Sequence, residues 1–468
     1  MLPVYGPYGL NASQEVGILL AQYEDAASSY VPLVLLEGFA MGSLCACALL
    51  GSYILWIKLR STTRALLITA LWFSLTVTLI HWALSLRQLI SLINGGLSED
   101  TGSDALSIYE ELDGQQIAQY QAWQDAWELL LPLVTETVLF GFSSVLFAVT
   151  ACIYTRRWRS QGSLHFSPMA VVIPTLAATM YTLSMIHWAV SLGYFTRYRT
   201  SGKSASLHLT LVVLLSINAV LSDSIVLWRM CVVWDKRRLV LAFATVLIIA
   251  ISVFNVLNLV WDGASVKLSA IPSPGFNVGD TEIIVIYGKT YVGLAAAFVS
   301  LASNACATAL VGLKAWMHRR QLAELIRANG RRTLVERVME ILVDSGIVYT
   351  AIWALYCASF DVSIAPQSIT PYSPVVITAV DHLDYVMAQL TSIYPLAIFI
   401  LVAFDRVYHT RKPQMLSLSD VGRRANDGRE AVTVTFDIDV ERTALGRGSA
   451  YPSGGGEHEG DEIKQGHS

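Results

Sequence analysis

The sequence predicts an all-α fold, a bundle of about nine transmembrane helices with its N-terminus outside and its C-terminus in the cytoplasm. Hydrophobic residues make up 54% of the 468 residues and charged residues only 15%, and the mean hydropathy is +0.51. This composition lies outside the usual balance of a water-soluble domain. The apolar residues fall into nine long segments, and basic residues gather in alternate connections between them. We therefore expect lipid to be the main solvent of this chain.

Each of the nine segments is long enough to cross a bilayer as a helix. Crossing ~30 Å of hydrocarbon takes about 20 apolar residues, and a helix satisfies its own backbone hydrogen bonds where water is absent. The segments are residues 32–57, 65–93, 129–154, 168–195, 207–233, 239–261, 288–316, 337–360 and 376–404. The first 30 residues contain no basic region or cleavage site, so we expect the first helix to start insertion itself.

The charges of the short connections predict the orientation, because Lys and Arg are retained on the cytoplasmic side. Basic clusters follow the first, third, fifth and seventh segments, at residues 58–64, 156–159, 236–238 and 314–332. The second connection is acidic and has no Lys or Arg, which places it outside. The fourth connection departs from the alternation, since it contains Arg197, Arg199 and Lys203. The other connections agree with one another, and they decide the prediction.

The two ends of the chain are consistent with this orientation. Asn11 begins an Asn-Ala-Ser glycosylation acceptor, which would be used only on the extracellular or lumenal side. Residues 405–468 are polar and rich in Gly and Ser, which predicts a disordered cytoplasmic tail. We expect the plasma membrane as the location. The predicted parts are an extracellular segment 1–31, a helix pair 32–93, an acidic extracellular loop 94–128, a seven-helix core 129–404 and the tail 405–468.

The first helix pair is duplicated within the chain. Residues 80–86 read Ile-His-Trp-Ala-Leu-Ser-Leu, and residues 186–192 read Ile-His-Trp-Ala-Val-Ser-Leu. The preceding segments also match, since Glu37 is followed by Gly42 and Glu136 by Gly141 at the same spacing. Both copies enter the membrane from the same side, so residues 32–93 and 129–195 form a parallel repeat, related by an axis along the membrane normal.

Four strings, at residues 223–234, 303–308, 344–349 and 393–395, stand out within residues 129–404. Together they resemble an uncharacterised seven-helix integral membrane protein family of mushroom-forming (basidiomycete) fungi. The resemblance implies a receptor-like architecture with two extra N-terminal helices, and it supplies no ligand. Asp344 stands where we expect Glu in the family, so a buried acid is still implied. The Asp-Arg-Tyr and Asn-Pro-x-x-Tyr strings of rhodopsin-like receptors are missing, and no motif supports G-protein coupling.

Four ionisable residues are expected in the outer half of the membrane, namely Glu37, His81, Glu136 and His187. If the repeat pairs are adjacent, each His can donate to a carboxylate, which would make a ligand or proton site. Alternatively, each His bonds a hydroxyl or backbone group and only holds helices together. A third hypothesis, a haem with two axial His ligands, uses the same two histidines.

A second polar group is expected in the inner half, formed by Asp223, Arg229, Asn304 and Asp344. Asp223 and Arg229 are six positions apart on one helix and point roughly 120° away from each other. Asp344 is therefore the predicted partner of Arg229. The group would act either as a polar switch that links an outer ligand to the cytoplasmic face or as a static ion pair that fixes helix register.

Other functional classes are less well supported by the sequence. There is no Gly-rich phosphate loop, His-Glu-x-x-His string or Gly-x-Ser-x-Gly turn, which disfavours an enzyme. Asp381, His382 and Asp384 lack a fourth metal ligand and are better explained as a solvated helix end. We expect no metal, cofactor or nucleic-acid partner. The expected partners are the lipid bilayer, an unknown small-molecule or peptide ligand, and anionic lipid or a signalling protein at the basic loop 314–337.

Two hypotheses of function remain. A receptor-like sensor is the leading one, because the outer loop is acidic and aromatic, the inner polar group is buried, and the inner loops are basic. A secondary transporter of a small solute or a proton-coupled carrier is the alternative. It is suggested by the parallel repeat with Glu and His inside the membrane.

Overall fold

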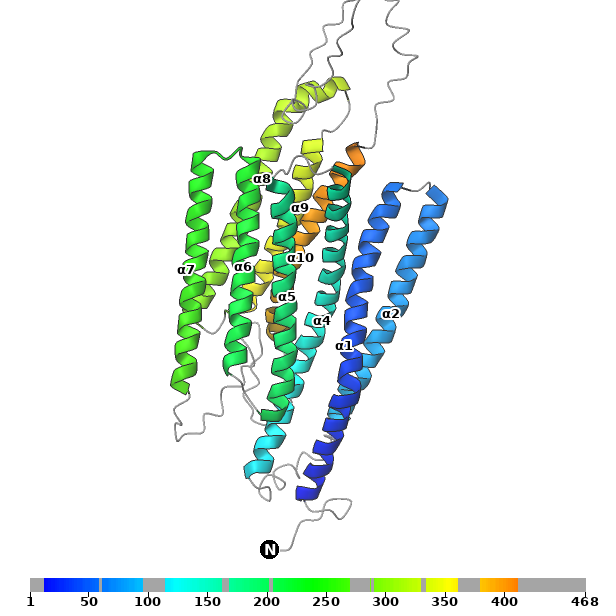
Figure 1. The fold of residues 1–468 in the computed structure, drawn as a ribbon, viewed down its shortest axis with the longest axis vertical. Coiled ribbons are helices and arrows are strands. Elements are labelled where there is room, and N and C mark those ends of the chain that lie inside the picture. Colours follow the sequence, from blue (N-terminus) through cyan, green and yellow to red (C-terminus); the bar gives the residue numbers. More distant parts are fainter. Residues whose placement is uncertain are drawn as a thin grey trace, which may run out of the picture. The chain divides into compact units, whose positions relative to one another are not determined.

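The structure is a computed structural model, and it describes residues 12–58, 61–95, 114–161, 168–201, 205–269, 287, 290–329, 334–360 and 379–410. Over this part of the chain there are nine helices and no strand (Figure 1), which confirms the all-α prediction. The helices are α1 Ala12–Lys58, α2 Ser61–Gly95, α4 Gly114–Gln161, α5 Pro168–Ser201, α6 Ala205–Val233, α7 Arg238–Ser269, α8 Tyr291–Asn329, α9 Leu334–Ala358 and α10 Ala379–Thr410.

Each helix contains one of the nine predicted membrane segments. The apolar stretches are Ser28–Trp56, Ala65–Ile90, Leu129–Arg156, Val171–Arg197, Ser206–Val233, Arg238–Trp261, Tyr291–Arg320, Met339–Ser359 and Leu383–Ala403. Most limits agree with the prediction to within a few residues. The ninth stretch begins at Leu383, and residues 376–378 of the predicted segment lie outside the described part of the chain. The chain is therefore a multi-pass membrane protein.

Two of the described helices begin well before their membrane segments. α1 begins at Ala12 and α4 at Gly114, within regions that the sequence predicted as an extracellular segment and a loop. Residues 114–128 consist largely of Gln, Ala, Glu and Trp without Pro, and Gln, Ala and Glu are good helix formers. Adding a turn to an existing helix avoids the cost of nucleation, so the membrane helix continues into the polar region.

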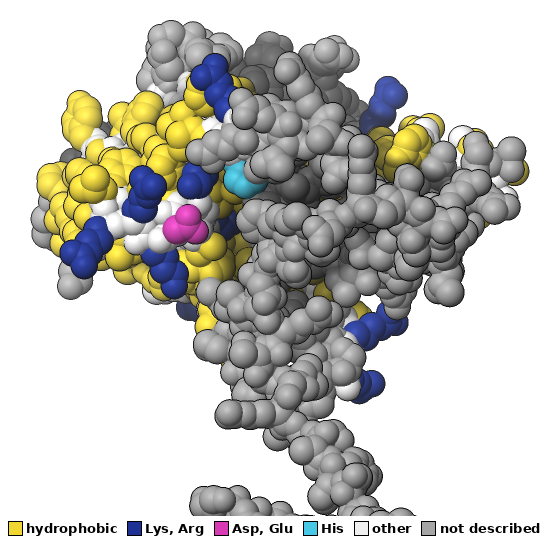
Figure 2. Space-filling view, turned by 90° about the horizontal axis from the view of Figure 1, so that it is seen from above, with side chains coloured by type: hydrophobic (Ala, Val, Ile, Leu, Met, Phe, Trp, Pro, Cys, Tyr) yellow, Lys and Arg dark blue, Asp and Glu magenta, His cyan; other side chains and the backbone are white. Residues whose placement is uncertain are grey.

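The bundle has two ends, which we name by the direction of the helices. The near end is where α1, α4, α6, α8 and α10 begin, and the far end is where they finish (Figure 1). Figure 2 shows the far end, where Lys and Arg side chains predominate among the charged residues drawn in colour. The exposed basic residues at this end are Arg156, Arg159, Lys236, Arg237, Arg238, Arg319 and Arg320. The positive-inside rule assigns such an end to the cytoplasm, and the orientation stays a prediction.

Helix α10 is the most enclosed of the nine described helices. It packs against α4, α5, α6 and α9, and nearly every side chain from Met387 to Ile400 is buried. Polar residues are part of this interior: Asp384, Gln389, Thr391 and Ser392 have no exposed surface. In lipid the hydrophobic effect does not drive helices together, so buried polar contacts and close packing determine which helices associate.

The two copies of the repeat pack directly on each other through α1 and α4. A Cβ atom added to Gly42 would lie 1.7 Å from the carbonyl oxygen of Val138, and one added to Gly141 would lie 2.1 Å from that of Phe39. Positions 39 and 138, like 42 and 141, are 99 residues apart, so the contact is reciprocal. Reciprocal contacts of equivalent residues define a two-fold interface. The predicted parallel repeat is thus built around a local two-fold axis, with glycines where the backbones touch.

Helix α2 lies at the edge of this arrangement. Its main neighbour is α1, and large apolar side chains such as Leu66 and Phe73, both 71% exposed, point away from the bundle. An apolar outer surface is expected where a helix faces lipid. The equivalent helix of the second copy, α5, has neighbours on more sides, because it packs against α4, α6 and α10.

Candidate functional site

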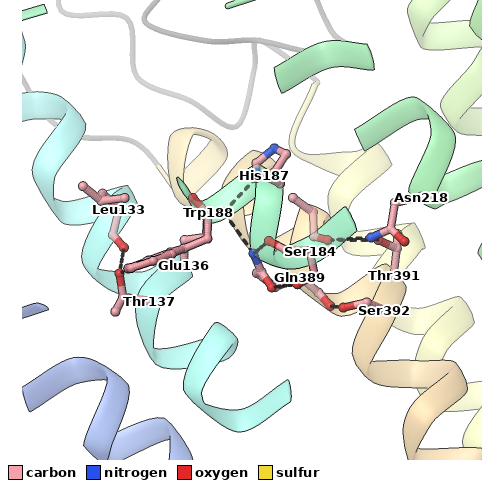
Figure 3. A network of polar contacts seen from close by, with 11 residues as sticks. Leu133, Glu136, Thr137, Ser184, His187, Trp188, Asn218, Gln389, Thr391 and Ser392 are labelled. Carbon is pink, nitrogen blue, oxygen red and sulfur yellow. Dashed lines mark hydrogen bonds and ion pairs between the residues drawn. The ribbon is translucent and has the colours of Figure 1, made fainter. Parts of the chain in front are cut away.

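A buried acid and a buried histidine meet in the second copy of the repeat. Nδ1 of His187 on α5 lies 2.7 Å from Oε1 of Glu136 on α4 (Figure 3), and the two residues are 3% and 0% exposed. This is one of the two His–Glu contacts that the repeat suggested. The other ring nitrogen of His187 and the other oxygen of Glu136 are buried without a hydrogen-bond partner.

Helix α10 closes this site with a side-chain amide. Nε2 of Gln389 donates to Oε1 of Glu136 at 3.0 Å, and the hydroxyl of Ser184 on α5 donates to Oε1 of Gln389. Gln389 thereby joins α4, α5 and α10 through one group that both donates and accepts. The sequence analysis did not single out this residue. An amide within the apolar run 385–401 was the available signal, since polar side chains at bilayer depth seek partners inside the protein.

Two neighbouring contacts fix the helices around the site. Nε1 of Trp188 donates to the hydroxyl of Thr137 at 2.9 Å, which is a second bond between α5 and α4. On the other side, the amide of Asn218 on α6 donates to the hydroxyl of Thr391 and to the carbonyl of Ala388 on α10 (Figure 3). The polar core thus connects four helices.

The first copy of the repeat does not form the equivalent site. His81 is exposed on α2, and no hydrogen bond joins it to Glu37 among the described residues. Oε2 of Glu37 is buried without a partner. The physical reason is that none of the described helices covers this copy as α10 covers the second one, so Glu37 receives no amide like the one that Gln389 donates to Glu136. Of the His–Glu contacts that the repeat allowed, the structure brings together Glu136 and His187 and leaves His81 exposed, without a bond to Glu37 among the described residues.

A glycine explains another difference between the copies. Gly38 stands where the second copy has Thr137, and Nε1 of Trp82 is buried without a partner 3.8 Å from the position of an added Cβ. The nearest other atom to that Cβ is 3.4 Å away, an ordinary contact. A hydroxyl at this position would accept the indole N–H, as Thr137 does for Trp188.

We expect Gly38→Ser to stabilise the protein by about 1 kcal/mol, because it gives Trp82 a hydrogen bond and removes a flexible glycine from a helix. Thermal unfolding of the purified protein in detergent measures the change. Gly38→Ala is the control, since it supplies the helix propensity without the hydroxyl. Equal melting temperatures for the two variants would show that the hydrogen bond does not form.

The predicted inner polar group is divided in the structure. Asp223 on α6 is 1% exposed, and it accepts hydrogen bonds from Ser300 at 2.6 Å and from Asn304 at 2.9 Å, both on α8. The structure thus brings together Asp223 and Asn304, as the sequence suggested. Ser300 was not foreseen, although it lies one helical turn before Asn304 and so on the same face of α8.

Arg229 and Asp344 do not meet, which corrects the expected pairing. Nη2 of Arg229 donates instead to the hydroxyl of Tyr394 on α10 at 2.7 Å, and the guanidinium lies 5.2 Å from that ring's centroid. Asp344 is exposed. Gly346 of α9 faces α8 closely, since its added Cβ would meet Thr308 at 2.5 Å. Asp344 precedes Gly346 by two residues, which is a rotation of about 200° around the helix axis, so Asp344 points away from α8.

Aromatic rings continue from Tyr394 through the interior of the bundle. Tyr349 stacks on Tyr394 with 4.0 Å between ring centroids, and its hydroxyl lies 3.0 Å from that of Ser222. Trp353 and Tyr356 follow along α9 in edge-to-face contacts. Edge-to-face and offset arrangements are the favoured geometries of aromatic pairs. These rings link the Arg229 contact with the near end of the bundle.

Asp384 is a further residue for which the structure corrects the sequence prediction. It was assigned to a solvated helix end, but it is 0% exposed and accepts a hydrogen bond from the hydroxyl of Tyr356. Tyr287 packs edge-to-face on Tyr356 and donates to Asn255 at 2.8 Å. Burial raises the pKa of Tyr287 well above its ordinary value, so its hydroxyl stays protonated and remains a donor. The side chains of Asp381 and His382, and the whole of Asn11, lie outside the described residues.

An apolar cavity of about 480 Å³ lies between α1, α4 and α5, beside the Glu136–His187 pair. A volume of this size is within the ~300–1,000 Å³ typical of small-molecule sites. Its wall includes Thr137 and Trp188, the sequence neighbours of Glu136 and His187, and Phe140 stacks on Trp188 with 5.0 Å between centroids. The remaining lining residues are Ser28, Val31, Pro32, Leu35, Leu36, Phe39, Leu192, Phe195 and Thr196.

These lining residues and the hydrogen bonds behind them define what the site can do. The apolar wall suits a hydrophobic molecule, and the polar core behind the wall connects α4 and α5 to α10. Among the described residues, no three His, Cys, Asp or Glu side chains gather as metal ligands would. Comparison with known proteins found no match to a protein-family model, a curated protein or a solved structure.

Proposed function

We propose that this multi-pass membrane protein is a receptor-like sensor for an apolar small molecule that enters the cavity between α1, α4 and α5 from the lipid. The observation that carries the proposal is the position of Trp188 and Thr137. They form part of the cavity wall, they are bonded to each other, and they adjoin His187 and Glu136 in the sequence. An occupant of the cavity would therefore press on the two helices that hold the buried pair.

Helix α10 would carry the signal to the far end. It is bound to the pair through Gln389, and one to two turns further along it holds Arg229 of α6 through Tyr394. A shift of α10 that lengthens the first contact would also disturb the second, because a helix moves largely as a rigid body. A ligand shifts the equilibrium between the two positions of α10 only by the difference in its affinity for them. The cavity must therefore have a different shape in each of the two arrangements.

The far end supplies a surface for the response. Arg320 lies 3.9 Å from the ring centroid of Trp316, and Lys314 lies 5.5 Å from that of Trp234. These cations would face the cytoplasm in the predicted orientation, where a signalling partner or anionic lipid would meet them. The proposal includes the plasma membrane as location and membership of the basidiomycete seven-helix family, which the strings at residues 223–234 and 393–395 support.

A cavity-filling substitution tests the proposal without a known ligand. We expect Leu192→Trp to occupy the cavity as a ligand would and to change the distance between spin labels at Arg159→Cys on α4 and Lys236→Cys in the turn that follows α6. Both label positions are exposed at the far end. Pulsed electron spin resonance in nanodiscs measures the distance, in a background whose exposed native cysteines are replaced by alanine.

Two controls make the measurement specific. Tyr394→Phe removes the hydrogen bond to Arg229 and should abolish the distance change caused by Leu192→Trp. A diazirine-labelled fatty acid and a diazirine-labelled sterol should react with α1 and α5 in the unmodified protein and much less in Leu192→Trp. Unchanged spin-label distances in the filled variant would contradict the receptor proposal.

A secondary transporter is the second candidate function, and the Glu136–His187 pair favours it. Each residue of the pair has one buried polar atom without a hydrogen-bond partner, where a proton or a solute could bind. Intramembrane acid–histidine pairs serve as proton relays in pumps and transporters. Proton-coupled solute uptake into proteoliposomes, lost in Glu136→Gln, would support this function. Absence of uptake with the unmodified protein would count against it.

A further inference from the structure

The polar residues that surround Gln389 in the second copy of the repeat have counterparts in the first copy. Glu37, Thr78 and His81 of the first copy correspond to Glu136, Ser184 and His187 of the second. In the second copy the carboxylate of Glu136 accepts a hydrogen bond from the amide nitrogen of Gln389, and the hydroxyl of Ser184 donates one to the amide oxygen of Gln389. The first copy therefore retains an acceptor and a hydroxyl donor at the equivalent places.

No helix of the described chain covers this set in the first copy. His81 is exposed, Oε2 of Glu37 has no hydrogen-bond partner, and the Thr78 hydroxyl turns back to the carbonyl of Ser74 at 2.9 Å. Around these residues α2 presents exposed apolar side chains, including Val77, Ile80 and Leu84. Polar residues within a membrane segment almost always face the protein interior or a water-filled cavity. His81 is exposed on this apolar surface, and Glu37 and Thr78 lie half-buried beside it, so the set marks a missing neighbour.

We infer that the face formed by Glu37, Thr78 and His81 binds a membrane-spanning helix of another protein that presents a side-chain amide, Gln or Asn. The first copy would receive this helix as the second copy receives α10. The partner helix would run in the same direction as α1, because α10 runs in the same direction as α4.

The chemistry of the face selects the amide. A carboxylate acceptor and a hydroxyl donor together require a group that both donates and accepts hydrogen bonds, which a carboxamide does. A carboxylate would be repelled by Glu37, and an ammonium group would leave the hydroxyl of Thr78 without an acceptor. A phospholipid has acyl chains at this depth and offers no hydrogen-bond donor. The amide also needs no charge to be buried in the membrane.

A peptide with the sequence of α10 is a suitable probe, since α10 is the helix that the equivalent face already holds. A synthetic peptide of residues 379–410 is added to the full-length protein in nanodiscs, and binding is followed by resonance energy transfer. We expect roughly tenfold weaker binding after Gln389→Leu in the peptide, and a similar loss after Glu37→Leu or His81→Leu in the protein. Thr76→Ala is the matched control, because Thr76 is exposed on α2 outside the set and should leave binding unchanged.

Crosslinking identifies where the peptide binds. With photo-methionine at position 387 of the peptide, labelling of α1 and α2 is expected. Labelling of α4 or α5 instead would mean that the peptide replaces native α10, and it would overturn the inference. Binding that is unaffected by Gln389→Leu would also overturn it. A third contrary result is a dimer of the unmodified protein that disappears in Glu37→Leu, since the occupant would then be a second copy of this chain.

Discussion

Gly42→Ala is expected to separate α1 from α4 and to lower the stability of the protein by at least about 3 kcal/mol. The added methyl group would lie 1.7 Å from the carbonyl oxygen and 2.6 Å from the carbonyl carbon of Val138. These are backbone atoms, so no side-chain rotation relieves the clash and one helix must move. Overpacking a core typically costs ~1–3 kcal/mol, and this contact is closer than side-chain overpacking produces. Thermal unfolding in detergent and the yield of monodisperse protein measure the effect.

The reciprocal glycine provides an internal test of the same contact. Gly141→Ala should destabilise by a similar amount, because its added Cβ would lie 2.1 Å from the carbonyl of Phe39. The double variant should cost less than the sum of the two, since one separation of the helices relieves both clashes. Gly193→Ala on α5 is the control, because it has no atom within 4 Å and should be neutral or slightly stabilising. Full stability of Gly42→Ala would refute the close crossing.

Glu136→Leu is expected to destabilise the protein by about 3 kcal/mol, the second large effect. The substitution leaves Nδ1 of His187 buried without its acceptor, and Nε2 of Gln389 keeps only its longer bond of 3.4 Å to the carbonyl of Ser184. Membrane hydrogen bonds average only about 0.6 kcal/mol in mutant cycles, but breaking a buried acid–base pair by removing one partner costs ~3–5 kcal/mol. The larger figure applies here, because both residues are at most 3% exposed and neither lipid nor water reaches the stranded groups. Unfolding in mixed micelles measures the free energy.

The repeat supplies the matched control for this substitution. Glu37→Leu changes the same residue type at the equivalent position, but Oε2 of Glu37 already lacks a partner, so its loss should be neutral or stabilising. His187→Leu combined with Glu136→Leu should be less harmful than the sum of the single changes, because no charge or donor of the pair is then stranded. Equal destabilisation by Glu37→Leu and Glu136→Leu would show that the His187 contact contributes little.

The helical segments and the duplication were predictable because they depend on local or repeated sequence patterns. Crossing lipid requires an uninterrupted apolar run, so the nine segments could be read from composition alone. The Glu37/Gly42 and Glu136/Gly141 spacing predicted a repeat of equivalent helices. In the structure each glycine lies against the backbone of the other helix, as a two-fold arrangement requires. The pairing of a His with a Glu in the second copy also followed from this pattern.

The partners of individual polar residues were much less predictable. Arg229 was expected to bind Asp344, but it binds Tyr394, and Asp384 was expected in solvent, but it is buried against Tyr356. In a helix that is apolar on all sides, no amphipathic stripe shows which face is inward. A position one or two residues away on the same helix points to a different neighbour, as Asp344 and Gly346 illustrate.

The sequence by itself determined the solvent of this protein, the number of its membrane helices and the presence of two equivalent helix pairs. These properties are set by the free energy of placing each segment in lipid, which is nearly additive along the chain. Only the tertiary structure decided that α10 covers one pair and leaves the other open, so that Glu136 and His187 form a buried site while Glu37 and His81 do not. That choice depends on packing between helices far apart in sequence, which no single segment encodes.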